Sequence, residues 1–354
     1  MLATNLDNPR KLFVDGGGAL YVAEAGSGGS DKCLSTGANA TCVGLSGAVT
    51  RVVEGRQRRV VTGLPSWAMP AATDASGPAA VLVRGRTFFV LLQDGGVRPT
   101  GANVLGVDGK AAGKLVTTSA GRARPVPVAD FARFEAAHNP DHGAGPGPKL
   151  GNPVIDSDPY AFVPYGGGFA VADAGANDLL WVSPKGKVSL LAVFPTQTVK
   201  LTKAVATSVG LPPKLRSIAV QSVPDSIAVG PDGALYIGEL TGRPFPRGRA
   251  RVWRVVPGRK PTVYASGFTN ISDLAFDGRD LLVLEIAAKG LTDPKHAGAL
   301  IRLLPSGRRT VVVDRGLVAP TGLAVSRGRI YISDCGVCPA QGPGPHGRVV
   351  SLAG

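Results

Sequence analysis

The chain has 354 residues and 44% of them are hydrophobic, which excludes an intrinsically disordered protein and allows a large core. Gly 49 and Pro 29 are typical of an all-β protein with many turns, and no apolar run is long enough to span a membrane. The net charge of +14 is scattered over turns without stacking aromatics, which favours a solvated or wall-binding basic surface and argues against specific nucleic-acid binding.

The first predicted element is a pair of strands at residues 8–26, NPRKLFVDGGGALYVAEAG, preceded by residues with neither a basic nor an apolar region. No export signal is therefore predicted in the printed sequence. The segment GGGALYVAEAG is repeated in similar form as PDGALYIGELTG at residues 231–242, and less similar copies occur at other positions. The six copies start near residues 8, 77, 158, 223, 270 and 319.

Each copy predicts the same local structure. An apolar strand, in most copies preceded by a proline, leads through a Gly-containing turn into a strand rich in β-branched and aromatic residues. Asp232-Gly233 and Asp277-Gly278 are strong hairpin signals, because glycine tolerates positive φ. Most copies continue into a second hairpin, for example at residues 48–64 and 179–194. Each module is thus a four-stranded antiparallel meander, which is one blade of a β-propeller.

The two ends of the chain are predicted to share one blade. Only 34 residues follow position 320, which is too few for a complete blade. Residues 347–354 are expected to form the third strand of the last blade, and residues 1–6 its fourth strand, so that no free sheet edge is left. The prediction is a single all-β domain, residues 1–354, folded as a six-bladed propeller.

Three insertions interrupt the repeats, at residues 27–46, 128–151 and 196–222. In the second, Asp130 is expected to cap one short helix that carries Phe131 and Phe134 on one face and ends before Asn139-Pro140. The third is expected to pack over one face of the propeller. Long loops on a rigid scaffold are where binding usually occurs.

The four cysteines form two close pairs, Cys33 with Cys42 and Cys335 with Cys338. Paired cysteines in loops favour two short disulfides and an oxidising compartment. A structural zinc site would need the two loops to meet, and a redox-active CxxC normally begins a helix, which the sequence around CGVC does not predict.

Several of these segments together resemble the bacterial ScyD/ScyE family, named for scytonemin-biosynthesis proteins and widespread in actinomycetes. The stretch GELTGRPFPRGRARVWRV at residues 238–255 is the most specific, and FARFEAAHNPD at residues 131–141 adds to it. The resemblance covers essentially the whole chain and implies a six-bladed propeller, usually exported, without a settled activity. The visible lack of an export signal, the second blade (FFVLLQDGG) and the motif CGVC depart from the family pattern.

Five acidic residues share one position, just past the second strand of a copy. We call Glu24, Asp173, Glu239, Glu285 and Asp334 the blade acids; the second copy has Leu92-Gln93 there. An acid that recurs with the repeat is expected to accept backbone N–H bonds from a neighbouring turn, and the alternative is a functional site.

A second set of polar residues stands where the innermost strands begin, and it is the candidate binding site at the channel mouth. Its members are Asn8, Arg10, Asp158, Tyr160, Asp225, Asn270, Ser272, Asp273 and Thr321. Carboxylate and amide oxygens suit a hard cation such as Ca²⁺, for which Asp158, Asp225 and Asn270 are the candidate ligands. Related propellers with metal-dependent lactonase activity use acidic and Asn ligands in this region. The alternative is that these side chains only cap strands.

These observations lead to a function prediction with two alternatives. A secreted scaffold that binds a small molecule or a protein at the channel mouth is favoured, and we expect it to be a monomer. One alternative is a metal-assisted, lactonase- or hydrolase-like enzyme acting on a small secondary metabolite, and the other is a structural role in the cell envelope. No nucleophile elbow, zinc-binding helix or phosphate-binding loop is found, and the four histidines stand alone in loops.

Overall fold

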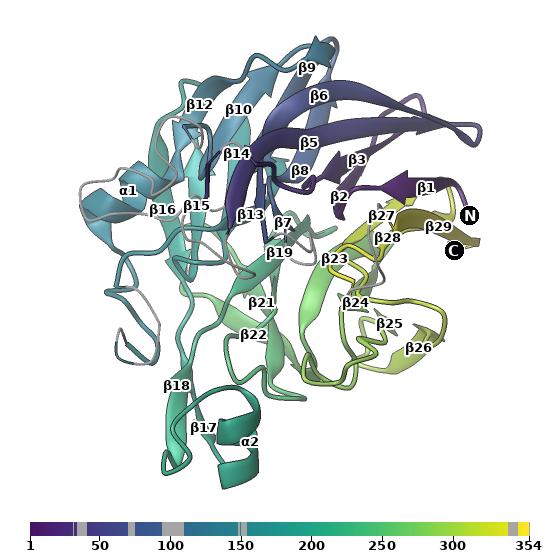
Figure 1. The fold of residues 1–354 in the computed structure, drawn as a ribbon. Coiled ribbons are helices and arrows are strands. Elements are labelled where there is room, and N and C mark those ends of the chain that lie inside the picture. The colour runs from purple at the N-terminus through teal and green to yellow at the C-terminus, as the bar shows by residue number, and fades with distance from the viewer. Residues whose placement is uncertain are drawn as a thin grey trace.

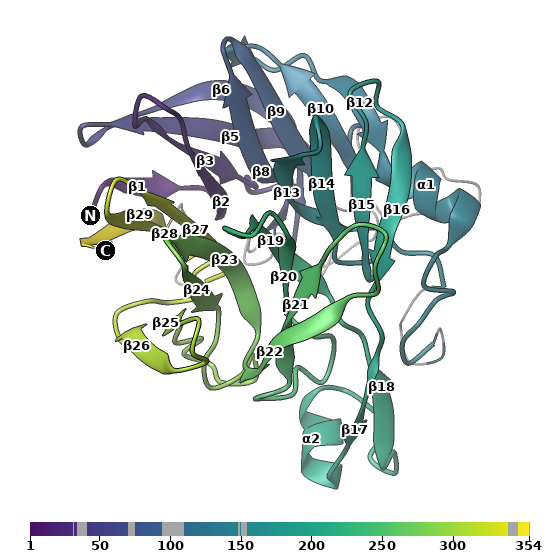
Figure 2. The same cartoon turned by 180° about the vertical axis from the view of Figure 1, so that it is seen from behind.

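The structure is a computed structural model that describes residues 1–30, 32–33, 41–69, 75–93, 110–147, 149, 154–338 and 346–353. Its main sheets are arranged as blades around a central axis (Figures 1 and 2). The predicted six-bladed β-propeller with four-stranded antiparallel blades is confirmed. Each innermost strand begins next to the axis, and the chain then runs outward through its blade.

The blades are numbered in chain order, and the strands of each are given from the axis outward. Blade one consists of β2 (Pro9–Val14), β3 (Leu20–Glu24), β5 (Cys42–Val53) and β6 (Arg56–Ala68), with the short strands β4 (Lys32–Cys33), β7 (Ala75–Ser76) and β11 (Gly121–Arg122) paired to its outer part. Blade two consists of β8 (Pro78–Arg84), β9 (Thr87–Leu92), β10 (Lys114–Thr118) and β12 (Val126–Asp130). Blade three consists of β13 (Pro159–Tyr165), β14 (Gly168–Asp173), β15 (Asp178–Val182) and β16 (Val188–Val193).

The remaining blades follow the same plan. Blade four consists of β19 (Pro224–Val229), β20 (Leu235–Glu239), β21 (Ala250–Val255) and β22 (Thr262–Phe268). Blade five consists of β23 (Ile271–Asp277), β24 (Asp280–Glu285), β25 (Ala299–Leu303) and β26 (Arg309–Val313). Blade six consists of β27 (Gly322–Ser326), β28 (Arg329–Asp334), β29 (Gly347–Ala353) and β1 (Ala3–Leu6).

Blade six contains both ends of the chain, as predicted. β1 pairs antiparallel with β29, with Ala3 opposite Val349 and Leu6 opposite Gly347. Figure 1 accordingly shows the N- and C-termini side by side at the rim of this blade. Leu6 is 1% exposed and packs in a cluster with Leu20 of blade one, so the first strand also contributes to the contact between blades six and one.

The core forms a ring between the blades. Neighbouring blades share clusters of buried aliphatic and aromatic side chains, from blades one and two around to blades six and one. Burial of this apolar surface is the main favourable contribution to folding. The turn predicted at Asp232-Gly233 closes β19 and β20 with Gly233 at φ +76°, a conformation that glycine adopts without steric penalty.

Two helices lie in the insertions of the described residues. α1 (Phe131–His138) is the predicted helix, and the carboxylate of Asp130 caps it by accepting a hydrogen bond from the Arg133 backbone N–H at 2.9 Å. Residues 128–130, expected to belong to the insertion, form the end of the outer strand β12 instead. Among these described residues, no helix is long and apolar enough to cross a membrane.

The third insertion is a small structure of its own. It consists of β17 (Gln197–Lys200), the unpredicted helix α2 (Lys203–Ser208) and β18 (Ser217–Val220), which pairs with β17. Its apolar side chains, such as Val199 and Ile218, are buried against one another. In Figures 1 and 2 it extends outward beyond the blades, so the expectation that it packs over one face is wrong.

Candidate functional site

The six innermost strands surround a central channel with a volume of about 360 Å³. Its wall is mostly apolar and includes Val81, Phe162 and Leu274, and the charged side chains among its described lining residues stand near the starts of the strands. Lys11 of β2 and Asp273 of β23 are the charged residues that line it. This end of the channel is the mouth predicted from the sequence.

A buried ion pair joins blades one and five at the mouth. The Lys11 ammonium lies 3.2 Å from the Asp273 carboxylate, and both side chains are 7% exposed. The same ammonium donates to the backbone carbonyl of Ser272 and lies 5.2 Å from the ring centre of Tyr160. Asp273 also accepts a hydrogen bond from the Leu323 backbone N–H at 2.7 Å, so its carboxylate connects blades one, five and six.

Asp225 stands beside this pair at the start of β19 and is 5% exposed. Burial raises the pKa of its carboxyl to about 7. The charges of Lys11 and Arg10 lower this pKa, and the charge of Asp273 raises it, so all three act on the same group. A carboxyl whose pKa is near neutrality can give or take a proton under physiological conditions.

Arg10 and Thr321 bond to backbone atoms around the mouth. The buried Arg10 guanidinium donates to the carbonyls of Ala75, at 2.6 Å, and Gly336. The Thr321 hydroxyl donates to the Pro9 carbonyl at 2.7 Å. These contacts hold the start of blade one against blade six and the neighbouring loops. Their role in binding a ligand stays a prediction.

The two asparagines before innermost strands also bond to neighbouring loops. The side-chain amide of Asn8 donates to the Gly26 carbonyl, and that of Asn270 donates to the Leu240 carbonyl, both at 2.8 Å. The Asp158 backbone N–H donates to Asp173 at 2.7 Å. In the described part of the chain, no group of three or more His, Cys, Asp or Glu side chains is arranged to hold a metal ion. The assignment of a metal to Asp158, Asp225 and Asn270 stays a prediction.

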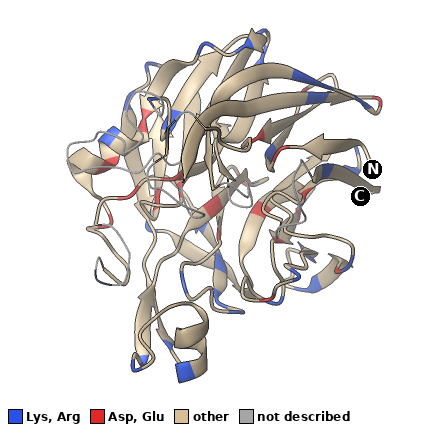
Figure 3. Cartoon of the chain, in the orientation of Figure 1, with Lys and Arg blue, Asp and Glu red and all other residues tan. Residues whose placement is uncertain are grey.

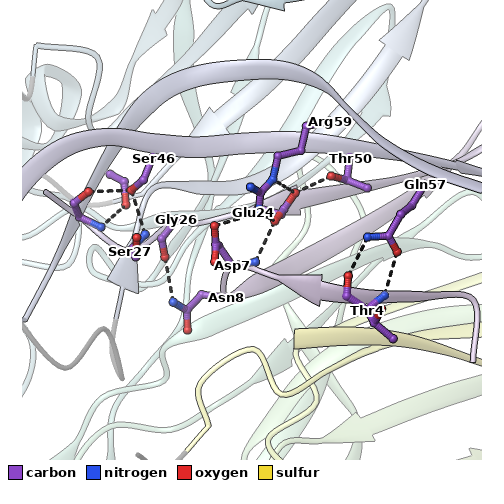
Figure 4. Close-up of polar contacts among 12 residues, drawn as sticks. Thr4, Asp7, Asn8, Glu24, Gly26, Ser27, Ser46, Thr50, Gln57 and Arg59 are labelled. Carbon is purple, nitrogen blue, oxygen red and sulfur yellow. Dashed lines mark hydrogen bonds and ion pairs between the residues drawn. The ribbon is translucent and has the colours of Figure 1, made fainter. Parts of the chain in front are cut away.

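Each blade acid accepts a hydrogen bond from the segment that leads into the innermost strand of its own blade. In four of the five the donor is a backbone N–H, as the recurrence predicted, and for Glu239 it is the Ser222 hydroxyl. The bonds run from Asp7 N to Glu24 at 2.8 Å, from Asp158 N to Asp173 at 2.7 Å, from Ser222 Oγ to Glu239 at 2.7 Å, from Thr269 N to Glu285 at 2.7 Å and from Val318 N to Asp334 at 2.7 Å. Figure 4 shows the first of these groups, in which Glu24 lies between Asp7, Thr50 and Arg59.

Three of the blade acids also pair with an arginine of their own blade. The pairs and their shortest N···O distances are Glu24 with Arg59 at 2.7 Å, Glu239 with Arg251 at 2.7 Å and Asp334 with Arg348 at 2.6 Å. In blade five burial raises the pKa of Glu285 to about 7, and the charge of Arg309 lowers it only in part. The blade acids are therefore structural residues, and the sequence prediction that favoured this role is confirmed.

Both predicted disulfides are present. Cys33 and Cys42 join β4 to β5, and Cys335 and Cys338 close a short loop after β28. Residues 34–40 and 339–345, which stand beside these cysteines in the sequence, lie outside the described residues. The basic residues are dispersed around the propeller and its outer strands, as Figure 3 shows.

Lys11 is the mouth residue that the sequence analysis missed. When the repeats are aligned, Lys11 and Asp273 occupy the same position, the fourth residue of their copies. The other copies have Ala80, Ala161, Ser226 and Gly322 there. The sequence signal was a charged residue at a position where the other copies have a small residue. The folded ring is needed to show that Lys11 and Asp273 lie in contact.

No protein-family model matches the sequence, and no curated protein matches it. Solved structures share the fold at low identity. A PQQ-bound aldose sugar dehydrogenase from Streptomyces coelicolor is similar with a TM-score of 0.55, 11% identity and coverage of 100% of this chain and 96% of that chain. The calcium-binding protein regucalcin from Agrobacterium tumefaciens is similar with a TM-score of 0.51, 11% identity and coverage of 93% and 84%. A streptogramin B lyase is similar with a TM-score of 0.50, 10% identity and coverage of 94% and 93%.

Proposed function

We propose that the chain is an exported, ScyD/ScyE-like propeller that binds a small molecule or a protein at the channel mouth. The contact residues would be Lys11, Tyr160, Asp225 and Asp273, with the neighbouring loops forming the rim. The two disulfides support export, because such bonds persist in oxidising compartments. The resemblance of residues 238–255 to the ScyD/ScyE pattern supports the family assignment.

The observation that carries this proposal is the buried charge cluster above an apolar channel. An ion pair removed from water adds little net stability, because desolvation offsets most of the attraction between the charges. Apolar side chains of similar size would serve folding at least as well at Lys11 and Asp273. A concave, mostly apolar site with a few converging polar groups is the usual form of a small-molecule site.

The same cluster favours a ligand with polar groups over a metal ion at the mouth. The Lys11 ammonium already lies beside the carboxylates that a divalent cation would need. A second positive charge placed there would be repelled by Lys11 and Arg10. A ligand that carries a hydroxyl, carbonyl or carboxylate group has donors from Lys11 and acceptors from Asp225 and Asp273 to bind.

A second candidate function is that of a lactonase- or hydrolase-like enzyme acting on a small metabolite. The near-neutral pKa of Asp225 favours it, because general acid–base catalysis works best when the pKa of the group is close to the working pH. The sequence prediction adds a metal at Asp158, Asp225 and Asn270. Structural neighbours described as a calcium-binding protein, a dehydrogenase and a lyase support this only as examples of what the fold can host.

A thermal-shift screen tests the binding proposal. The purified chain would be melted with a panel of small hydroxy acids, lactones, sugars and short peptides, and in the variants Asp225→Asn, Tyr160→Ala and Val229→Ser. Val229 is the matched control, because it lines the same channel at the other end of β19. We expect a compound that raises the Tm of the wild type and of Val229→Ser, and that has a much weaker effect on the two mouth variants.

Two results distinguish the candidates. A compound that is chemically converted by the wild type but not by Asp225→Asn, as followed by mass spectrometry, would favour the enzyme. A compound that stabilises all four proteins equally binds elsewhere and would contradict the mouth as the site.

A further inference from the structure

Blade three differs from blade six in the charge of the residue opposite its blade acid. In blade six the blade acid Asp334 stands directly opposite Arg348 in the strand register, and the two form an ion pair. In blade three the residue opposite the blade acid Asp173 is Asp178. An acidic side chain thus stands where blade six has a guanidinium, so the residue opposite Asp173 supplies no positive charge. Both Asp173 and Asp178 are fully buried.

Two buried carboxyl groups near this position accept no hydrogen bond from the described part of the chain. Asp178 is 0% exposed and Glu135, on the inner face of α1, is 1% exposed. None of their four carboxyl oxygens has a hydrogen-bond partner among the described residues. A buried polar group without a partner is strongly unfavourable, and an unpaired buried charge more so.

The carboxyl groups around them are already bonded to neutral donors. Asp173 accepts from the Ser157 hydroxyl at 2.6 Å, and Asp141 accepts from the Asn177 amide at 2.8 Å. Asp178 and Glu135 interact electrostatically with each other and with both of these groups. In the part of the chain that the structure describes, none of these four carboxyl groups forms an ion pair with a lysine or an arginine.

We propose that one hard divalent cation, of the Ca²⁺ class, binds between α1 and the start of β15, with Asp178 and Glu135 as its carboxylate ligands. Ca²⁺ takes six to eight oxygen ligands, and two bidentate carboxylates supply four. Backbone carbonyls and water complete such sites, so two acidic side chains suffice. The two positive charges of the ion would offset the negative charges of the Asp178 and Glu135 carboxylates.

The cation would fasten α1 to blade three. α1 comes from the insertion that follows blade two, and its apolar residue Phe131 already packs between blades two and three. Asp173, next to the cation, holds the backbone at Asp158, where the innermost strand of blade three begins. The proposed ion is therefore structural and is separate from the channel mouth.

Equilibrium dialysis with ⁴⁵Ca²⁺, and competition with Mg²⁺, tests the site on the full chain after EDTA treatment. We expect one Ca²⁺ per chain. Asp178→Asn and Glu135→Gln should each weaken Ca²⁺ binding by roughly 100-fold or more. Mutation of a residue that only hydrogen-bonds to a metal ligand already weakens metal binding by roughly 10- to 100-fold. Two control variants should bind Ca²⁺ like the wild type: Asp314→Asn, at an exposed carboxylate, and Asp225→Asn, at the mouth.

Thermal melting adds a readout that a purely structural role for Asp178 would not give. Ca²⁺ at 100 times its Kd should raise the Tm of the wild type by about 4 °C. In EDTA, Asp178→Asn should have a higher Tm than the wild type, because the substitution removes one of the crowded carboxyl groups. Added Ca²⁺ should leave the Tm of this variant unchanged. Absence of Ca²⁺ and Mg²⁺ binding at millimolar concentration would show that protons neutralise the cluster and would overturn the proposal. So would binding that is lost in Asp225→Asn and kept in Asp178→Asn.

Discussion

Leu6→Ala tests whether the first strand is an integral part of blade six. Leu6 is 1% exposed and packs against side chains of blade one and of the C-terminal strand β29. Its strand pairs with β29 over the Ala3 to Leu6 segment. A residue in a loose N-terminal tail would make none of these contacts.

The expected loss of stability is about 3 kcal/mol, within the roughly 2–5 kcal/mol found when a buried leucine is truncated to alanine. Unfolding entropy of about 2 cal/mol/K per residue gives roughly 0.7 kcal/mol/K for a chain of this length. The Tm should then fall by about 4 °C. Urea denaturation followed by tryptophan fluorescence, and calorimetry, measure the two quantities.

Val311→Ala is the matched control for this substitution. Val311 stands on β26, the outer strand of blade five, and is 62% exposed. Its truncation should change stability by no more than about 0.5 kcal/mol. If Leu6→Ala is as stable as Val311→Ala, the closure of the ring by residues 1–6 is contradicted.

Three further predictions concern the blade acids and the cysteines. Burial keeps the pKa of Glu285 at about 7 in the folded protein, whereas the residue ionises from about pH 4.5 in the unfolded chain. As the pH rises from about 4.5 to about 7, the free energy of unfolding of the wild type should therefore fall by up to about 3 kcal/mol. Glu285→Gln should lack this fall, as measured by urea titrations at pH 5 and pH 8. Arg251→Met should destabilise by about 3–5 kcal/mol because it leaves buried Glu239 without its guanidinium. Arg254→Met, at a more exposed pair, should destabilise the protein much less than Arg251→Met does. The exported protein should contain no free thiol and should take up four hydrogens on reduction, as measured by intact mass.

Each of these predictions has a result that contradicts it. For Glu285, the contradicting result is that Glu285→Gln shows the same difference in stability between pH 5 and pH 8 as the wild type. For the two arginines it is an equal loss in both variants. For the cysteines it is four thiols that react with an alkylating reagent under non-reducing conditions.

The fold could be predicted because the same local rules are repeated. A phrase such as ALYVAE specifies a buried strand and a Gly turn specifies a hairpin, and neither depends on distant contacts. The closure of the ring followed from counting residues in the last copy. α2 was missed because its six residues include one valine and two alanines without a clear helical period, and the helix is stabilised by the small core of its own insertion.

The site was only partly predictable, because its contacts join residues that are far apart in the sequence. The repeat places Asp225 and Asp273 at the mouth, but it does not show that Lys11 reaches across from blade one. In the same way, Asp178 looks like an ordinary strand residue until its register opposite Asp173 and its electrostatic interaction with Glu135 of α1 are known. Which residues lie opposite each other in neighbouring strands, and which side chains meet between blades, is known only once the ring has folded.

The most direct test of the proposed binding site is a crystal structure of the chain with a compound that stabilises it. The account predicts ligand density at the channel mouth, in contact with Lys11, Tyr160 and Asp225. Density for the compound at another surface, with only water beside Lys11 and Asp225, would contradict it.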